Sequence, residues 1–263
     1  MSAAIRPLAR CVLSPRLSAG LTFRSMPPSV RTGDVHAVVS QARAVSLDLG
    51  GARLALLTNW DESENDQMFI TSVGEDTAEG DLAEYYRGQH AAWGFLPNYA
   101  AAFSNRPDVA RAWNALNTTI RDGMDRRRFE IATIAAARAR RSTYCTAAHS
   151  KFLRDACGDE TAMRSIAEQP DGAALDPQDR AVYEFAAKVA ADAASIEPQD
   201  VDRLRDVGLS DADIADVVFA ASARCFFTAV LDGLGAQLDP QTAEALPPAL
   251  LESMIVGRPV AGA

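Results

Sequence analysis

Helix boundaries recur along the chain from about residue 76, and they constrain the fold more than any other feature of the sequence. A capping residue, or a proline suited to the first helical turn, opens each expected helix, and a glycine closes half of them. The expected helices run from Asp76 or Thr77 to Gly94, from Pro97 over a short stretch, from Pro107 to Gly123, from Asp125 through RRRFEIATIAAARARR, from Ser142 onward, from about 176 to 194, over EPQDVDRLRDVG to Gly208, and from the Ser210–Asp213 capping box to Gly233 or Gly235. No strand alternation interrupts this part, so the sequence predicts an all-α domain over residues 68–263.

The first 67 residues differ from the rest, and we expect them to form an N-terminal extension that is in part poorly ordered. Residues 1–33 contain five arginines and no acidic residue, a composition typical of organelle transit peptides. The stretch DVHAVVSQARAVSLDLGGARLALLTNW follows, and its alternation favours one or two short strands. Three interpretations stay open: a transit peptide, a small accessory element, and a coding start placed too far upstream, with Met68 opening the true domain. We favour the third.

The acidic balance of the chain gives no indication of a nucleic-acid or membrane partner. The formal net charge is −9, and no apolar run approaches the roughly 20 residues that cross a bilayer. The four cysteines are scattered, without the spacing of metal ligands or of a disulfide framework. We therefore expect no metal, no cofactor and a reducing, cytoplasmic location.

The octet STYCTAAH at residues 142–149 contains the clearest candidate site. With Ser142 as the helix N-cap, Cys145 is the third helical residue, where free backbone N–H groups and the helix dipole favour a thiolate. His149 lies one turn further along the same face, and Ser142 lies on that face as well. The alternative interpretation is a small buried cysteine beside a structural histidine.

Glu130 is a candidate partner for this octet because its neighbours in the preceding expected helix are apolar. A carboxylate buried alone there would be strongly destabilising, so Glu130 needs a partner. Packing of the two helices could bring it to His149 or Cys145, which would combine a nucleophilic thiol, a proton-shuttling imidazole and an orienting carboxylate. Glu130 could instead pair with Arg126 or Arg127 one turn back, as a surface ion pair of little energetic value.

The stretch from Glu130 to His149 resembles the signature of the AhpD-like alkylhydroperoxidases within the carboxymuconolactone decarboxylase family. That signature is a glutamate, eleven residues, a cysteine, two residues, a second cysteine, three residues and a histidine. The spacing here matches throughout, with Ser142 in place of the first cysteine. The segments GFLPNYAAAFSNRPDVARAW and LDGLGAQLD…ALPPALLESMIVGRP also resemble peroxidase-related members, so the resemblance extends over roughly residues 68–260.

The resemblance implies an AhpD-like helical fold and the reduction of organic hydroperoxides. In the family, the second cysteine attacks the peroxide, the first resolves it as a disulfide, and the glutamate and histidine relay protons. Cys145 then corresponds to the attacking thiol and Glu130 and His149 to the relay, whereas Ser142 cannot form a disulfide. We therefore expect an external thiol reductant, either a small molecule or a protein. The resemblance also implies a homo-oligomer, a trimer or a related assembly.

Two other functions stay open at this point. One is a lyase that resembles the decarboxylase branch, in which Glu130 and His149 transfer protons on a lactone acid. This chemistry needs no resolving cysteine, so Ser142 is compatible with it. The other is a family member that kept the helices and lost catalysis.

The remaining candidate residues are assigned to structure. We expect the aromatic cluster before the octet to form core or a subunit interface, although some members could wall the site; it consists of Trp93, Phe95, Tyr99, Phe103 and Trp113. We expect His90 to cap a helix end or be solvated, and Arg126–Arg128 to be a solvated helix start. Cys157 would lie ~18 Å from Cys145 along a continued helix, and Cys225 falls on an apolar stripe, so neither is expected to resolve Cys145.

Overall fold

The computed structural model describes residues 45–49, 52–56 and 68–262. The chain divides into an N-terminal unit, residues 1–61, and a second unit that begins at Glu62. The N-terminal unit contains a hairpin in which β1 (Val45–Leu49) pairs antiparallel with β2 (Ala52–Leu56). This pair agrees with the one or two short strands expected there. The expected transit peptide, the partial disorder and the boundary at residue 67 lie outside the described residues and stay predictions.

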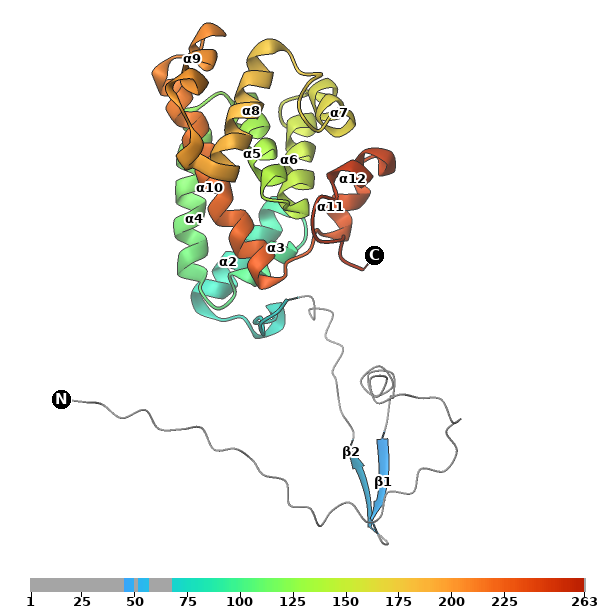
Figure 1. Ribbon diagram of the computed structural model, residues 1–263. Coiled ribbons are helices and arrows are strands. Elements are labelled where there is room, and N and C mark those ends of the chain that lie inside the picture. Colours follow the sequence, from blue (N-terminus) through green and yellow to red (C-terminus); the bar gives the residue numbers. More distant parts are fainter. Residues whose placement is uncertain (1–44, 50–51, 57–67, 263) are drawn as a thin grey trace, which may run out of the picture. The chain divides into compact units, whose positions relative to one another are not determined.

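The second unit is helical, as the sequence predicts (Figure 1). Its elements are η2 (Glu75–Thr77), α2 (Gly80–Trp93), α3 (Asn98–Ala102), α4 (Pro107–Gly123), α5 (Arg126–Ala139), α6 (Thr143–Asp155), α7 (Glu160–Glu168), α8 (Pro177–Asp192), η3 (Ala193–Ser195), α9 (Pro198–Asp206), α10 (Asp211–Leu234), α11 (Pro240–Glu244) and α12 (Pro248–Met254). The all-α prediction is confirmed for this unit.

Most helix boundaries follow the local signals in the sequence. The side chain of Asp125 accepts a hydrogen bond from the backbone N–H of Arg128 and so opens α5, and Ser210 and Asp213 form the predicted capping box of α10. Gly235 closes α10 in the left-handed conformation, with φ of 91°. The predicted start of α2 at Asp76 or Thr77 was wrong, because extended backbone at Ala78 and Glu79 separates η2 from α2.

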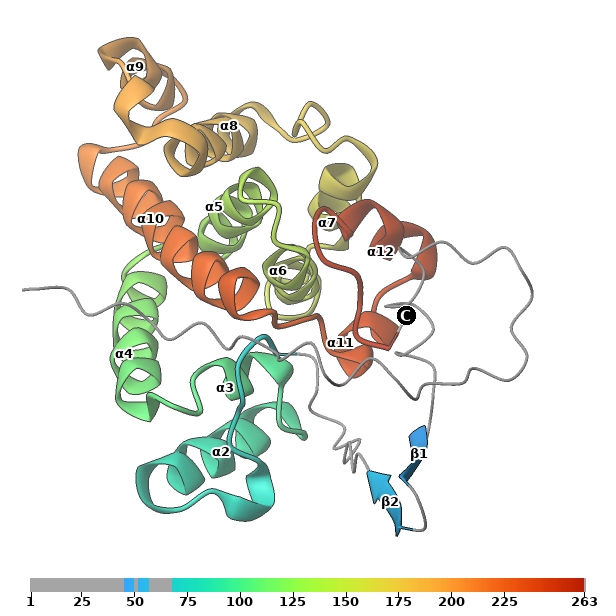
Figure 2. The ribbon, with the colours of Figure 1, turned by 60° about the horizontal axis from the view of Figure 1, so that its bottom comes forward.

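Helix α5 forms the centre of the core and contacts α6, α8 and α10 (Figure 2). Its residues from Phe129 to Ala137 are all buried, so this helix is enclosed on every side and not only along one stripe. Five of these nine residues, Ala132, Thr133 and Ala135–Ala137, have small side chains, which lets the neighbouring helices approach closely. Glu130 is therefore carried into the core by a helix with little access to solvent.

Helix α10 is, among the described residues, the one helix long and apolar enough to cross a bilayer by length and composition. Half of its most apolar window is buried inside the helical unit. It contacts α3, α4, α5, α6, α8 and α9. These contacts identify α10 as a core helix of the bundle.

Candidate functional site

Helix α6 places Cys145 at its third residue, as the sequence predicts, and buries it: 1% of its surface is exposed. Ser142 occupies the N-cap position with extended backbone, but its side chain makes no capping hydrogen bond. Its buried hydroxyl has no hydrogen-bond partner among the described residues. The predicted position of Ser142 is correct, and the predicted capping by its side chain was wrong.

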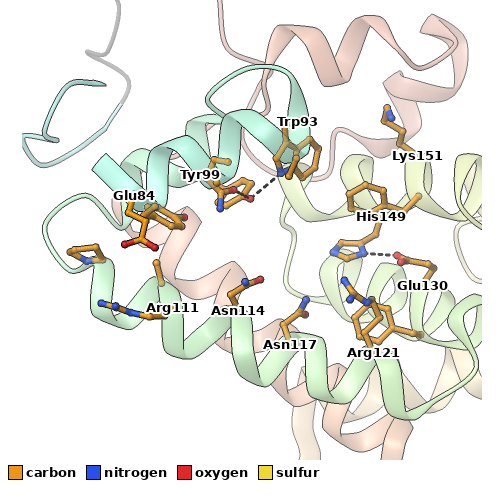
Figure 3. A pocket seen from close by; sticks show the side chains of 18 of the residues that line it. Glu84, Trp93, Tyr99, Arg111, Asn114, Asn117, Arg121, Glu130, His149 and Lys151 are labelled. Carbon is orange, nitrogen blue, oxygen red and sulfur yellow. Dashed lines mark hydrogen bonds and ion pairs between the residues drawn. The ribbon is translucent and has the colours of Figure 1, made fainter. Parts of the chain in front are cut away.

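Glu130 on α5 binds two side chains, His149 on α6 and Arg126 on its own helix. Its Oε2 lies 2.6 Å from Nδ1 of His149 on α6, and its Oε1 lies 2.7 Å from Nε of Arg126 one turn back. The glutamate side chain is fully buried, and Figure 3 shows it directed at the imidazole. The sequence left open a partner on the next helix or an arginine one turn back. Both are present, His149 on one carboxylate oxygen and Arg126 on the other.

This arrangement determines the protonation of the pair. Burial favours a neutral Glu130, but His149 and Arg126 outweigh burial and lower the pKa of the carboxyl group, which is ionised at neutral pH. Burial, together with the nearby charge of Arg224, lowers the pKa of His149 to about 4. A neutral imidazole whose Nδ1–H donates to the carboxylate leaves Nε2 as a free proton acceptor.

The thiol of Cys145 differs from the expected thiolate. Burial raises its pKa above the ordinary value, and the positive charge of Arg224 opposes this rise without cancelling it. The helix N-terminus was expected to favour the thiolate, but burial, the largest cause of the pKa shift of Cys145, acts in the opposite direction. In the resting protein, Cys145 is therefore a neutral thiol.

Arg224 is the site residue that the sequence analysis missed. It lies in the middle of α10, is 3% exposed, and its Nη1 donates to Sγ of Cys145 at 3.6 Å. Its guanidinium carbon lies 5.7 Å from the ring centre of Trp113 and 5.2 Å from that of Phe227. The signal was available: Arg224 is the one charged residue between Asp216 and Asp232 in an apolar stretch. It was overlooked because the chain contains many arginines, so a single arginine in the sequence does not by itself indicate a site.

Two adjoining hollows lie over these residues. The outer one, with a volume of about 680 Å³, is walled by α2 and α4 on one side and reaches Arg126, Glu130, His149 and Lys151 on the other (Figure 3). The inner one, with a volume of about 120 Å³, is lined by Cys145, His149 and Arg224 together with aromatic side chains. Nine residues line both hollows, His149 among them, so the two are continuous.

The aromatic cluster divides between the site and the core. Trp93, Tyr99 and Trp113 line the inner hollow, as the sequence analysis allowed for some members of the cluster, and Tyr99 and Trp113 also pack against the core. Their positions are fixed by direct contacts: Nε1 of Trp93 donates to the hydroxyl of Tyr99, and Trp113 stacks on Phe227 at 4.8 Å. Phe103 is buried in the core as expected.

The Arg126–Arg128 run is engaged in ion pairs and is not merely solvated, which corrects the sequence prediction. Arg127 binds Asp159 and Asp179, and Arg128 binds Asp213. His90 is partly exposed and pairs with Glu75 at 2.7 Å, in agreement with a solvated position.

The other described cysteines form no disulfide with Cys145. Cys145, Cys157 and Cys225 are all free thiols. Helix α6 ends at Asp155, before Cys157, and Sγ of Cys225 is directed at the carbonyl oxygen of Ala190 on α8. Over the described ranges, no group of three or more His, Cys, Asp and Glu side chains is arranged to hold a metal ion.

Comparison with known proteins finds a family model that matches the part of the chain that contains this site. Residues 107–188 match the carboxymuconolactone decarboxylase family, a segment that includes Glu130, Ser142, Cys145 and His149. No curated protein matches the chain in sequence.

Solved structures share the fold at low sequence identity. A peroxidase-related protein from Ralstonia eutropha JMP134, with an alkylhydroperoxidase AhpD core, has a TM-score of 0.61 at 21% identity, over 67% of this chain and 94% of its own. A peroxidase-related protein from Silicibacter sp. TM1040 has a TM-score of 0.57 at 21% identity, over 65% and 93%. A cysteine-to-alanine variant of the debrominase Bmp8, bound to 2,3,4-tribromopyrrole, has a TM-score of 0.58 at 17% identity, over 69% and 97%. These likenesses confirm the AhpD-like helical fold.

Proposed function

We propose that this chain is a member of the carboxymuconolactone decarboxylase family, whose model matches residues 107–188, and that it reduces organic hydroperoxides through the thiol of Cys145. The observation that carries the proposal is the inner hollow. It brings Cys145 and His149 to one small space, with Glu130 fixed behind the imidazole at 2.6 Å. A nucleophile, a base and a group that orients the base are thus present in the order that nucleophilic catalysis requires.

In the first half of the proposed reaction, Nε2 of His149 takes the proton of the Cys145 thiol, and Glu130 stabilises the imidazolium that forms. The thiolate attacks the terminal oxygen of the hydroperoxide, the S–O bond forms, and the O–O bond breaks. The departing alkoxide takes the proton from His149 and leaves as an alcohol. Cys145 is oxidised to a sulfenic acid, and His149 returns to its neutral state.

In the second half, an external thiol attacks the sulfenic acid and releases water, which leaves a mixed disulfide on Cys145. A second external thiol then reduces that disulfide and restores the Cys145 thiol. Ser142 supports this route because it stands where the resembling family has a resolving cysteine. Such a cycle consumes thiols, so we propose a reducing compartment, the cytoplasm, as its location.

The hollows also restrict the substrate. The inner hollow of about 120 Å³ is close to the roughly 150 Å³ of an engineered apolar cavity that accepts benzene. Seven of its fifteen lining residues are Tyr, Trp or Phe. We therefore propose a hydroperoxide on a compact apolar group, with any longer part of the molecule in the outer hollow.

The proposal is tested by intact-mass measurement after brief exposure to an organic hydroperoxide with a sulfenic-acid trap present. A single adduct that maps to Cys145 is expected in the wild-type protein and must be absent in Cys145→Ser. Glu130→Gln and His149→Gln should slow its formation by about 10²-fold or more, the contribution typical of a general base. An unmodified Cys145 in folded wild-type protein would contradict the proposal.

The competing lyase function rests on one feature of the same site. The Glu130–His149 pair is complete without Cys145 and could move protons on a carboxylated lactone. Cys145→Ser separates the two functions, because it removes peroxide reduction and leaves the proton-transfer pair in place. Decarboxylation that survives in this variant, with no peroxide reaction in the wild type, would establish the lyase. Absence of both reactions would indicate a non-catalytic member.

A further inference from the structure

Arg224 is a buried cation that has no carboxylate partner among the described residues. Its single hydrogen bond among the described residues goes to Sγ of Cys145, and its Nε has no partner there. An arginine stays protonated in proteins, and a buried charge is costly unless it is paired. Burial of Arg224 is costly, and the hydrogen bond that it makes there is to the sulfur of Cys145.

The neighbours of Arg224 keep its guanidinium in place and out of water. Trp113 on α4 and Phe227 on α10 stack at 4.8 Å, and both rings lie within 6 Å of the guanidinium carbon. This is the distance range of cation–π attraction, which strengthens when the cation is desolvated. Exclusion of water also strengthens the attraction between the guanidinium and any negative charge on Sγ.

The other ionisable groups near Sγ do not provide a positive charge in the resting protein. His149 on α6 is neutral, and Glu130 on α5 is an anion paired with His149 and Arg126. Asp232 on α10 acts in the opposite direction, since its carboxyl group raises the pKa of Cys145. Among the described residues, Arg224 is the only cation within hydrogen-bond distance of Sγ.

We propose that Arg224 is a catalytic residue that stabilises the Cys145 thiolate when the thiol proton moves to His149. The transfer creates a negative charge on sulfur and a positive charge on the imidazole. Arg224 faces the first and Glu130 faces the second. Each new charge therefore forms beside a fixed opposite charge, an arrangement that requires little reorganisation during the reaction.

The inference deepens the proposed function, because it assigns the residue that activates its nucleophile. It is tested on the full chain by the pH dependence of iodoacetamide alkylation of Cys145, measured on the Cys145 peptide so that the other cysteines do not interfere. An opposite charge at this range shifts a pKa by about 1–3 units. Arg224→Gln should therefore raise the thiol pKa by at least about one unit, which lowers the thiolate fraction about tenfold at a fixed lower pH.

Two further variants distinguish charge from structure. Arg224→Lys keeps the positive charge and should retain part of the effect, whereas Arg224→Met fills similar space without charge and should behave as Arg224→Gln. Arg121→Gln is the matched control, because Arg121 lines the outer hollow and pairs with Asp122 instead of Cys145. In Arg121→Gln, the pKa of the Cys145 thiol should equal that of the wild type.

An unchanged thiol pKa in a folded Arg224→Gln or Arg224→Met protein would overturn the inference. Equal loss in Arg224→Lys and Arg224→Met would overturn it as well, because charge would then not be the cause. Alkylation needs no peroxide. If the thiol pKa depends on Arg224 but Cys145 does not react with hydroperoxides, the proposed function is refuted. The inference about Arg224 and the thiolate still holds in that case.

Discussion

The two ring nitrogens of His149 have different tasks, and Glu130 assigns them. Because Nδ1 faces a carboxylate oxygen at 2.6 Å, the neutral ring carries its proton there and leaves Nε2 unprotonated. Burial and the charge of Arg224 keep the ring neutral by lowering the pKa of His149 to about 4. A protein with the ring in the other tautomer would have no base to receive the thiol proton.

We expect the imidazole of His149 to stay neutral, with its proton on Nδ1, as the pH falls from 7.5 to 5.5. Two-dimensional ¹H–¹⁵N spectra of the ring nitrogens measure this directly, and the chain has only three histidines to assign. Comparison with His149→Gln identifies the signal. A titration midpoint near the ordinary value of about 6.5 would contradict the expected environment.

The same pKa difference predicts a direction for stability. An unfolded chain takes up a proton on His149 as the pH falls below about 6.5, whereas the folded protein does not until about pH 4. The unfolded state then binds more protons, so the free energy of unfolding should decrease as the pH falls through this window. Urea unfolding at several pH values measures the slope, and a stability that rises from pH 6.5 toward 4 would contradict it.

At the scale of the helices, what the sequence could predict depended on whether the signal was local. The start of α5 at Asp125 and both ends of α10 follow from single capping residues, and the spacing from Glu130 to His149 needs only helical periodicity. The short helices α7, α11 and α12 were not predicted, although Asp159 caps α7 and a proline stands at the start of α11 and of α12. Helices this short are marginal on their own, and these three pack on α6 or on one another. Arg224 lies 79 residues after Cys145, and no local pattern links two such positions.

The thiol pKa shows the same limit. The position of Cys145 in the first turn of α6 is a local property, and it was predicted correctly. Its burial depends on how α10 and the aromatic side chains close over that turn, and burial determines the direction of the shift. The sequence spacing therefore predicts the position of Cys145 correctly, but it predicts a thiolate where burial favours the neutral thiol.

The first turn of α6 also predicts the result of restoring a second cysteine. Ser142 and Cys145 lie three residues apart at the start of α6, on one face of the helix, which is the spacing of the cysteine pair in the family that the chain resembles. Ser142→Cys should therefore form an internal disulfide after one peroxide reaction, in place of a trapped sulfenic acid. Intact mass would show the loss of two hydrogens, and steady-state turnover should depend less on the external thiol.

Thr146→Cys is the matched control for this variant. Ser142 and Thr146 are both buried hydroxyl residues without a hydrogen-bond partner among the described residues. Position 146 follows Cys145 directly, and successive side chains on a helix do not face each other. Thr146→Cys should keep the trapped adduct on Cys145. An adduct that also persists in Ser142→Cys would show that the turn is too rigid for disulfide formation.

At the scale of the whole molecule, α4 and α10 present large apolar side chains to solvent. Leu116 on α4 is 52% exposed, and Phe219 and Phe226 on α10 are 56% and 45% exposed. Phe226 packs on Trp113, one turn before Leu116, and Phe219 lies two turns before Phe226 on the same face of α10. Large exposed apolar patches mark interaction surfaces.

We propose that this face forms a contact between copies of the chain, in keeping with the homo-oligomer expected from the family resemblance. Light scattering coupled to size exclusion should give a mass above that of one chain for the wild type. Phe219→Glu should lower it, because a charge buried in an apolar contact is strongly unfavourable. The helical fold should survive, since this side chain is already more than half exposed.

Ile255→Glu is the control, because Ile255 is 42% exposed but lies after α12, away from α4 and α10 in the chain. It should leave the assembly mass unchanged. The assembly also bears on the site, since Trp113 contacts Phe226 on the exposed face and Arg224 in the inner hollow. A monomeric Phe219→Glu protein should therefore show an altered rate of Cys145 alkylation. If the wild-type protein is monomeric at micromolar concentration, the proposed contact between copies is ruled out.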